Sequence, residues 1–79
     1  MTHLREPRRR VLKGGKIIFN HSASVIDCTV RNLSAGGAAL EVESALGIPG
    51  EFRLAVPDEL ERQCQVAWTR GSRLGVKFI

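Results

Sequence analysis

Five short runs of this 79-residue chain alternate apolar and polar residues, and this alternation constrains the fold more than any other feature. Examples are "VIDCTVRN", "GAALEVE" and "RQCQVAWTR". Successive side chains of a strand point to opposite faces, so a period of two indicates β-strands with one buried face. Segments rich in Gly, Pro, Asn, Asp and Ser separate the runs, as turns do. "KIIF" at 16–19 is a sixth, less regular candidate, and "PDELE" predicts one helical turn at most.

Six short strands in so small a chain favour a closed barrel, because closure buries one face and leaves no exposed strand edge. The sequence therefore predicts an all-β fold, a six-stranded antiparallel closed β-barrel, with an open two-layer sandwich as the alternative. Gly75 and the pair Gly36 and Gly37 are expected at sharp bends or bulges. Apolar positions of shared parity form the predicted core: Ile26, Cys28, Val30, Leu40, Val42, Phe52, Leu54, Val66, Trp68, Val76 and Phe78.

The positive charge of the chain is concentrated at its beginning. Residues 1–16 carry six basic groups and one acidic group, whereas the remaining 63 residues carry six basic and seven acidic groups. We therefore expect a basic N-terminal arm, residues 1–10, that is mobile without a ligand, followed by a barrel domain, residues 11–79. Such an asymmetry indicates an anionic partner met by one segment, although a solvated tail that only aids solubility would show it too.

The sequence also argues against several classes of protein. No apolar run approaches the roughly 18 residues of a membrane span, so no membrane insertion is expected. The basic N-terminus lacks the apolar stretch of a signal peptide, and the expected compartment is the cytoplasm. Cys28 and Cys64 are expected to be free, packed thiols, and with His3 and His21 they form no zinc pattern. No catalytic arrangement of side chains is recognisable, so we predict no enzyme, no metal and no cofactor.

"NLSAGG", residues 32–37, lies between two of the alternating runs. Asn32 and Ser34 offer short donors and acceptors, and Gly36 and Gly37 would let a ligand approach the backbone closely. The same composition is typical of an ordinary turn. On this stretch alone, both interpretations are open.

Arginines in the arm bear on that choice. "REPRRR", residues 5–10, contains four of them, and guanidinium groups bind phosphates bidentately and pair with the O6/N7 edge of guanine. Pro7 stiffens the segment and favours an extended path. An arginine arm opposite a polar, glycine-lined strand end predicts a two-sided clamp for a phosphorylated guanine compound.

"REPRRR", followed about 20 residues later by "NLSAGG", resembles the RxxxR and [D/N]xSxxG motifs of PilZ domains. "RVLKGGKI" and the final "LGVKF" also resemble members of this family, so the resemblance covers roughly residues 4–79. It implies a six-stranded antiparallel barrel that binds the bacterial second messenger cyclic di-GMP. Many members add a C-terminal helix after the last strand, and none is expected here.

The resemblance also implies which residues bind the ligand. The arginines would hold the phosphates and a guanine edge, and the strand end would contact the other side of the ligand. The ligand-binding residues would be Arg5, Arg8, Arg9, Arg10, Asn32, Ser34, Gly36 and Gly37. Two registers are open for the first motif: either Arg5 pairs with Arg9, or Arg8 after Pro7 is the motif's second arginine and Leu4 occupies the first position.

The function implied is a signalling module that relays cyclic di-GMP to an unknown downstream protein through ordering of its arm. The alternative is a PilZ-fold protein-interaction module that does not bind the nucleotide. A nucleic-acid binder is disfavoured, because at least three of the four aromatic residues lie on the core parity and leave no stacking platform. Trp68 in particular is assigned to core packing.

Overall fold

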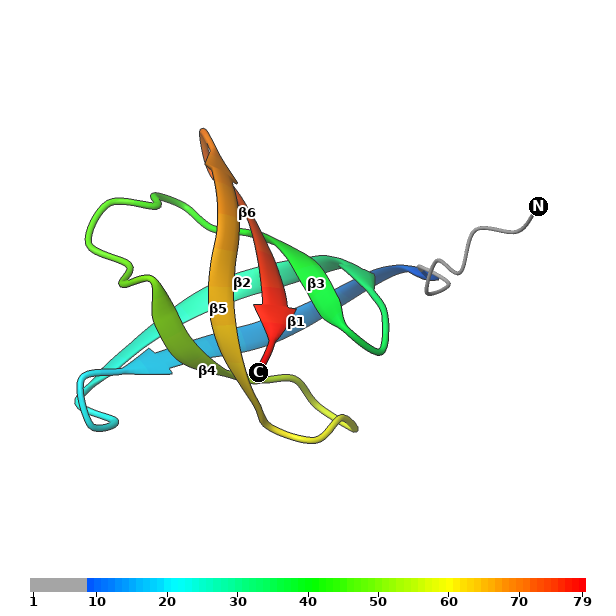
Figure 1. Cartoon of the computed structure of the whole chain (residues 1–79), viewed down its shortest axis with the longest axis horizontal. Coiled ribbons are helices and arrows are strands. Elements are labelled where there is room, and N and C mark those ends of the chain that lie inside the picture. Colours follow the sequence, from blue (N-terminus) through cyan, green and yellow to red (C-terminus); the bar gives the residue numbers. More distant parts are fainter. Residues whose placement is uncertain (1–8) are drawn as a thin grey trace.

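The structure is a computed structural model in which residues 9–79 are described. Its strands are β1 (Arg9–Phe19), β2 (Ser24–Leu33), β3 (Gly37–Glu41), β4 (Glu51–Ala55), β5 (Arg62–Arg70) and β6 (Arg73–Phe78). They pair antiparallel and close into a barrel in the order β1-β2-β3-β6-β5-β4 (Figure 1). The all-β barrel predicted from the alternation is confirmed, and the open sandwich is not formed. Within residues 9–79 there is no helix of the length and hydropathy that crossing a membrane requires.

β1 is the longest strand, and it closes the barrel. It pairs with β2 from Arg9 opposite Leu33 to Phe19 opposite Ser24. It also pairs with β4, over Lys16–Ile18 only. The strand begins inside the predicted arm of residues 1–10, so the last two residues of that arm belong to the barrel. Residues 1–8, and with them the expected mobility of the arm, lie outside the described residues.

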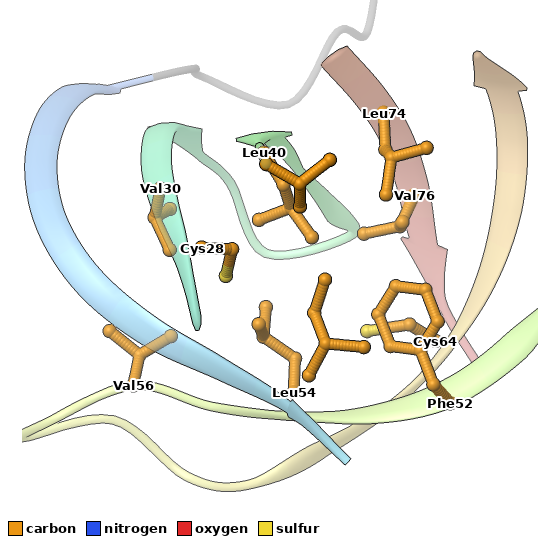
Figure 2. Close-up of a cluster of buried hydrophobic side chains, with 11 residues drawn as sticks. Cys28, Val30, Leu40, Phe52, Leu54, Val56, Cys64, Leu74 and Val76 are labelled. Atoms are coloured by element: carbon orange, nitrogen blue, oxygen red, sulfur yellow. The ribbon is translucent and has the colours of Figure 1, made fainter. Parts of the chain in front are cut away.

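The interior of the barrel is filled by apolar side chains from all six strands (Figure 2). The buried residues are Ile17, Cys28, Val30, Leu33, Leu40, Val42, Phe52, Leu54, Val56, Cys64, Leu74 and Val76. Seven of them belong to the predicted core. Three other predicted members, Ile26, Val66 and Phe78, are only partly buried and pack against this cluster.

β-bulges explain where the predicted parity fails. The β2–β3 register shifts between Val30 and Asn32, and an extra residue in one strand reverses the inward and outward positions beyond it. Val30 therefore points inward, as predicted. After the bulge the buried residue is Leu33, which the uninterrupted alternation would have placed on the outer face. Asn32 consequently faces outward.

A second bulge shifts the β5–β6 register between Val66 and Trp68. Trp68 lies opposite Gly75 on the outer face of the barrel and is 45% exposed. The prediction that Trp68 packs in the core is therefore wrong, because the alternation was extended through a position where the strand carries one extra residue.

Both cysteines are free and buried, as predicted. Burial raises the pKa of Cys28 to about 11, with the negative charge of Asp27 acting in the same direction and Lys16 opposing it. Burial also raises the pKa of Cys64 to about 11. Because the thiolate is the reactive form, these neutral thiols are suited to packing rather than to chemistry.

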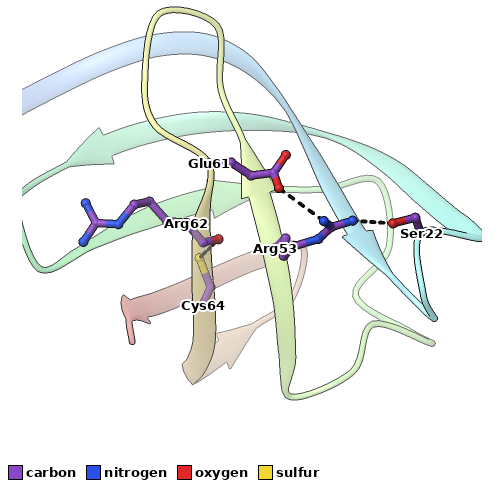
Figure 3. Close-up of polar contacts among 5 residues, drawn as sticks. All are labelled: Ser22, Arg53, Glu61, Arg62 and Cys64. Atoms are coloured by element: carbon purple, nitrogen blue, oxygen red, sulfur yellow. Dashed lines mark hydrogen bonds and ion pairs between the residues drawn. The ribbon is translucent and has the colours of Figure 1, made fainter.

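Polar contacts on the outside of the barrel tie its connections to its strands. The guanidinium of Arg53 on β4 pairs with Glu61 at 3.3 Å and donates a hydrogen bond to Ser22 in the β1–β2 turn (Figure 3). This turn contains three successive residues with positive φ, Asn20, His21 and Ser22. The Arg53 contacts therefore anchor a turn that adopts an uncommon backbone conformation.

Candidate functional site

An open cavity of about 780 Å³ lies on the outside of the barrel over the neighbouring strands β2, β3, β6 and β5. We call it the trough. Its lining includes the four residues predicted from "NLSAGG", namely Asn32, Ser34, Gly36 and Gly37, together with Trp68, Gly75 and Lys77. The structure thus brings the predicted strand end together with three residues from β5 and β6 that sequence reasoning had not placed there. Cavities of this size are typical of small-molecule sites.

The register of four strands explains the shape of the trough. Asn32 lies opposite Ala39, Ala39 opposite Gly75, and Gly75 opposite Trp68. Residues directly opposite one another share a face of the sheet, so these four form one row across the outer surface. The small residue Ala39 leaves a low floor between the Asn32 amide at one end and, at the other, the Trp68 indole, which lies over Gly75.

Trp68 lies directly over Gly75. A Cβ atom at Gly75 would come within 2.0 Å of Trp68 Nε1 and 2.2 Å of Cε2, so only glycine leaves space for this ring. The bulge expected near Gly75 lies opposite it in β5, between Val66 and Trp68, and the glycine also allows a close contact between the indole and the backbone. One side of the ring rests on Gly75, and the exposed remainder lines the trough.

"NLSAGG" itself forms the tight connection from β2 to β3. The Ser34 N–H donates to the Gly37 carbonyl at 2.9 Å, and the Gly37 N–H donates to Ser34 Oγ at 3.2 Å. The carbonyl of Gly36 accepts a hydrogen bond from the Phe78 N–H at 2.8 Å, which ties the turn to β6. The turn interpretation is therefore correct, and the same turn lines the trough, so the two interpretations do not exclude each other.

Gly37 allows β3 to approach β6 very closely. A Cβ atom at Gly37 would lie 2.3 Å from the carbonyl oxygen of Val76, which is a backbone atom and cannot swing aside. Any side chain at this position would push β3 away from β6 and deform the edge of the trough.

The first two arginines of β1 lie beside different cavities. Arg10 lies opposite Asn32, so its side chain shares the outer face beside the trough. Arg9 lies opposite the buried Leu33 and lines a second cavity at the end of the barrel. Arg5 and Arg8 are outside the described residues, so their roles stay predictions.

The side chains that line the trough provide groups that can bind a ligand. Among the described residues that line it there is no His, Cys, Asp or Glu, the side chains that most often exchange protons or hold metals. Among residues 9–79 there is also no group of three such residues placed to hold a metal ion. An aromatic wall, a flat floor, an amide, a hydroxyl and nearby cations can hold a planar ring that carries an anionic group.

Comparison with known proteins agrees with this architecture. The family model of the PilZ domain matches residues 4–79, which is essentially the whole chain. A search of curated proteins finds no significant match to it. The matched region includes all six strands, the arginines and the "NLSAGG" turn. The chain therefore belongs to the PilZ domain family.

Proposed function

We propose that the chain is a cyclic di-GMP-binding signalling module and that the trough is its ligand site. The PilZ domain is a family of cyclic di-GMP receptors rather than of catalysts. The observation that carries the proposal is the outward row from Asn32 through Ala39 and Gly75 to Trp68, which leaves a flat floor beside an exposed indole.

Cyclic di-GMP combines two guanine bases with two phosphates, and the trough offers a partner for each part. The indole of Trp68 can stack on a base, an interaction that typically contributes about 1–3 kcal/mol. The amide of Asn32 provides both donors and an acceptor for a guanine edge. Arg10 beside the trough and Lys77 within it supply positive charge for the phosphates.

The floor of the trough favours a planar ligand. Ala39 projects only a methyl group, so a flat ring can settle against the sheet between Asn32 and the Trp68 indole that covers Gly75. A larger side chain at Ala39 would fill the space that we assign to the base.

In this proposal the N-terminal arm, residues 1–10, transmits the signal. Arg10 lies opposite Asn32 near the start of β1, so this strand begins beside the trough. We propose that arginines of this arm close over the bound phosphates. A downstream protein would then recognise the arm in this ordered conformation. Cyclic di-GMP would have to be present in the same compartment, which we propose is the cytoplasm.

Arg10→Ala and Asn32→Ala test the assignment of the trough. Each is expected to weaken cyclic di-GMP binding about tenfold or more, because a guanidinium fork or a base-edge contact is lost. Arg10→Lys should weaken binding nearly as much as Arg10→Ala, since an ammonium group cannot make the bidentate contact. Calorimetric titration of each variant, with a melting curve to verify folding, measures the effect.

Lys16→Ala is the matched control, because it removes one exposed positive charge from the same strand at a position that lines neither cavity. Equal loss of affinity in the control would mean that net charge, not the trough, governs binding. The same titration with Arg8→Ala and Arg9→Ala distinguishes the two motif registers. If Arg8 is the residue required, Leu4→Arg should tighten binding by completing the motif.

A further inference from the structure

The second cavity, of about 450 Å³, is an open groove at one end of the barrel. We call it the end groove. At this end β2, β4 and β6 finish and β1 and β5 begin. Its floor is apolar and consists of the outermost core residues Leu33, Leu54 and Val56, together with the partly buried Phe78. Leu60, in the connection between β4 and β5, adds an 81% exposed apolar side chain at the rim.

Cations dominate the rim of the end groove. The guanidinium of Arg62 lies over the Phe78 ring, 4.4 Å from its centre, which holds this charge at the edge of the floor. Arg9 lines the groove as well. The carboxylate of Glu59 is paired with Lys13 at 3.2 Å, so it does not offset the two arginines. An apolar floor with a positive rim is complementary to an apolar surface bordered by carboxylates.

We propose that the end groove is a docking surface for an acidic amphipathic helix of a partner protein. The apolar stripe of the helix would cover Leu33, Val56 and Leu60, and carboxylates on its flanks would meet Arg9 and Arg62. The end groove adjoins the trough, because Leu33 and Ser34 line both cavities, but the proposal does not require that the trough bind a nucleotide.

A helix fits better than an added strand. Each of the six strands has a hydrogen-bonded neighbour on both sides over part of its length, but β1 pairs with β4 only over Lys16–Ile18, so the residues of β1 before Lys16 keep an unpaired edge on that side. The floor of the end groove, in contrast, consists of apolar side chains such as Leu33, Leu54 and Phe78, and a groove of this kind binds the apolar face of an amphipathic helix.

Charge and packing argue against other occupants. A second copy docked symmetrically would bring Arg9 and Arg62 against the same arginines. Residues 1–8 carry two arginines and one glutamate and would meet like charges at the rim. An acyl chain would need a channel into the barrel, but Leu54 is only 2% exposed and the core behind it is filled.

Nuclear magnetic resonance titration of the full chain with designed peptides tests the proposal. The probe is a helical peptide of about 15 residues with leucines on one face and glutamates on its flanks. A matched peptide carries lysine in place of every glutamate. The glutamate peptide is expected to shift the amide signals around Leu33, Val56 and Phe78 in a saturable way and to bind about tenfold more tightly than the lysine peptide.

Two variants with matched controls locate the contact. Arg62→Glu should reverse the preference between the peptides, and Leu60→Ser should weaken binding of the glutamate peptide several-fold. Arg70→Glu and Leu46→Ser change an exposed arginine and a similarly exposed leucine away from the end groove and should leave binding unchanged. Absence of saturable shifts at the groove, or no preference for the acidic peptide, overturns the proposal. A concentration-dependent dimer that Leu60→Ser abolishes would also overturn it, since the occupant would then be a second copy.

Discussion

Gly37→Ala is expected to lower the free energy of unfolding by about 3 kcal/mol or more. The new methyl group would lie 2.3 Å from the carbonyl oxygen of Val76, and relief requires that β3 move away from β6. That movement would strain the ladder in which Gly37 lies opposite Lys77. A chain of this length has a total stability of roughly 4–12 kcal/mol, so much of the protein is expected to be unfolded at moderate denaturant concentration.

Urea denaturation followed by far-ultraviolet circular dichroism measures this effect. Gly14→Ala is the matched control, because Gly14 also lies within a strand but a Cβ atom there meets nothing within 4 Å. The control should be neutral or slightly stabilising. Equal midpoints for Gly37→Ala and the parent would show that β3 and β6 do not approach as closely as described.

Gly75→Ala is expected to leave the barrel folded but to weaken cyclic di-GMP binding about tenfold or more. A methyl group at this position takes the space that Trp68 occupies, so the indole must swing off the floor toward solvent. Because the atoms displaced belong to a half-exposed side chain rather than to the backbone, the loss of stability should be smaller than for Gly37→Ala. The guanine base would then lose its stacking contact with the indole, whereas the pairing of all strands would be unchanged.

Tryptophan emission makes this prediction specific, because Trp68 is the only tryptophan in the chain. Emission of Gly75→Ala should shift to longer wavelength as the indole becomes more exposed. Calorimetry on the same sample gives the affinity, and Gly14→Ala again serves as the control. If the emission shifts but the affinity equals that of the parent, the indole is not part of the ligand site.

The barrel can be predicted from the sequence because the alternation of apolar residues and the composition of the turns are local signals. Cys28, Val30 and Val76 all stand on the buried face that the period of two predicts. The "NLSAGG" turn was located for the same reason, since its residues are adjacent in the chain. What local patterns cannot supply is the register between strands that are distant in sequence.

Trp68 shows this limit most clearly. Its outward direction depends on one extra residue in β5 after Val66, and a large apolar residue that continues an alternating run gives no sign of such a bulge. The signal that could have located it is the pair formed with Gly75, a glycine within an otherwise apolar strand that can accommodate a ring. Arg9 and Arg10 were likewise grouped as one arm, whereas strand pairing with β2 sends them to opposite faces.

Titration of the parent chain with cyclic di-GMP, followed by calorimetry and by Trp68 emission in the same buffer, tests the central claim most directly. Cyclic di-AMP and GTP are the comparison ligands. We predict saturable binding of cyclic di-GMP with a change in Trp68 emission, weaker binding as salt rises, and affinities about tenfold or more lower for the other two nucleotides. A folded protein that shows neither heat nor an emission change with about 100 μM cyclic di-GMP would contradict the account. The chain would then be a PilZ-fold interaction module without a nucleotide ligand.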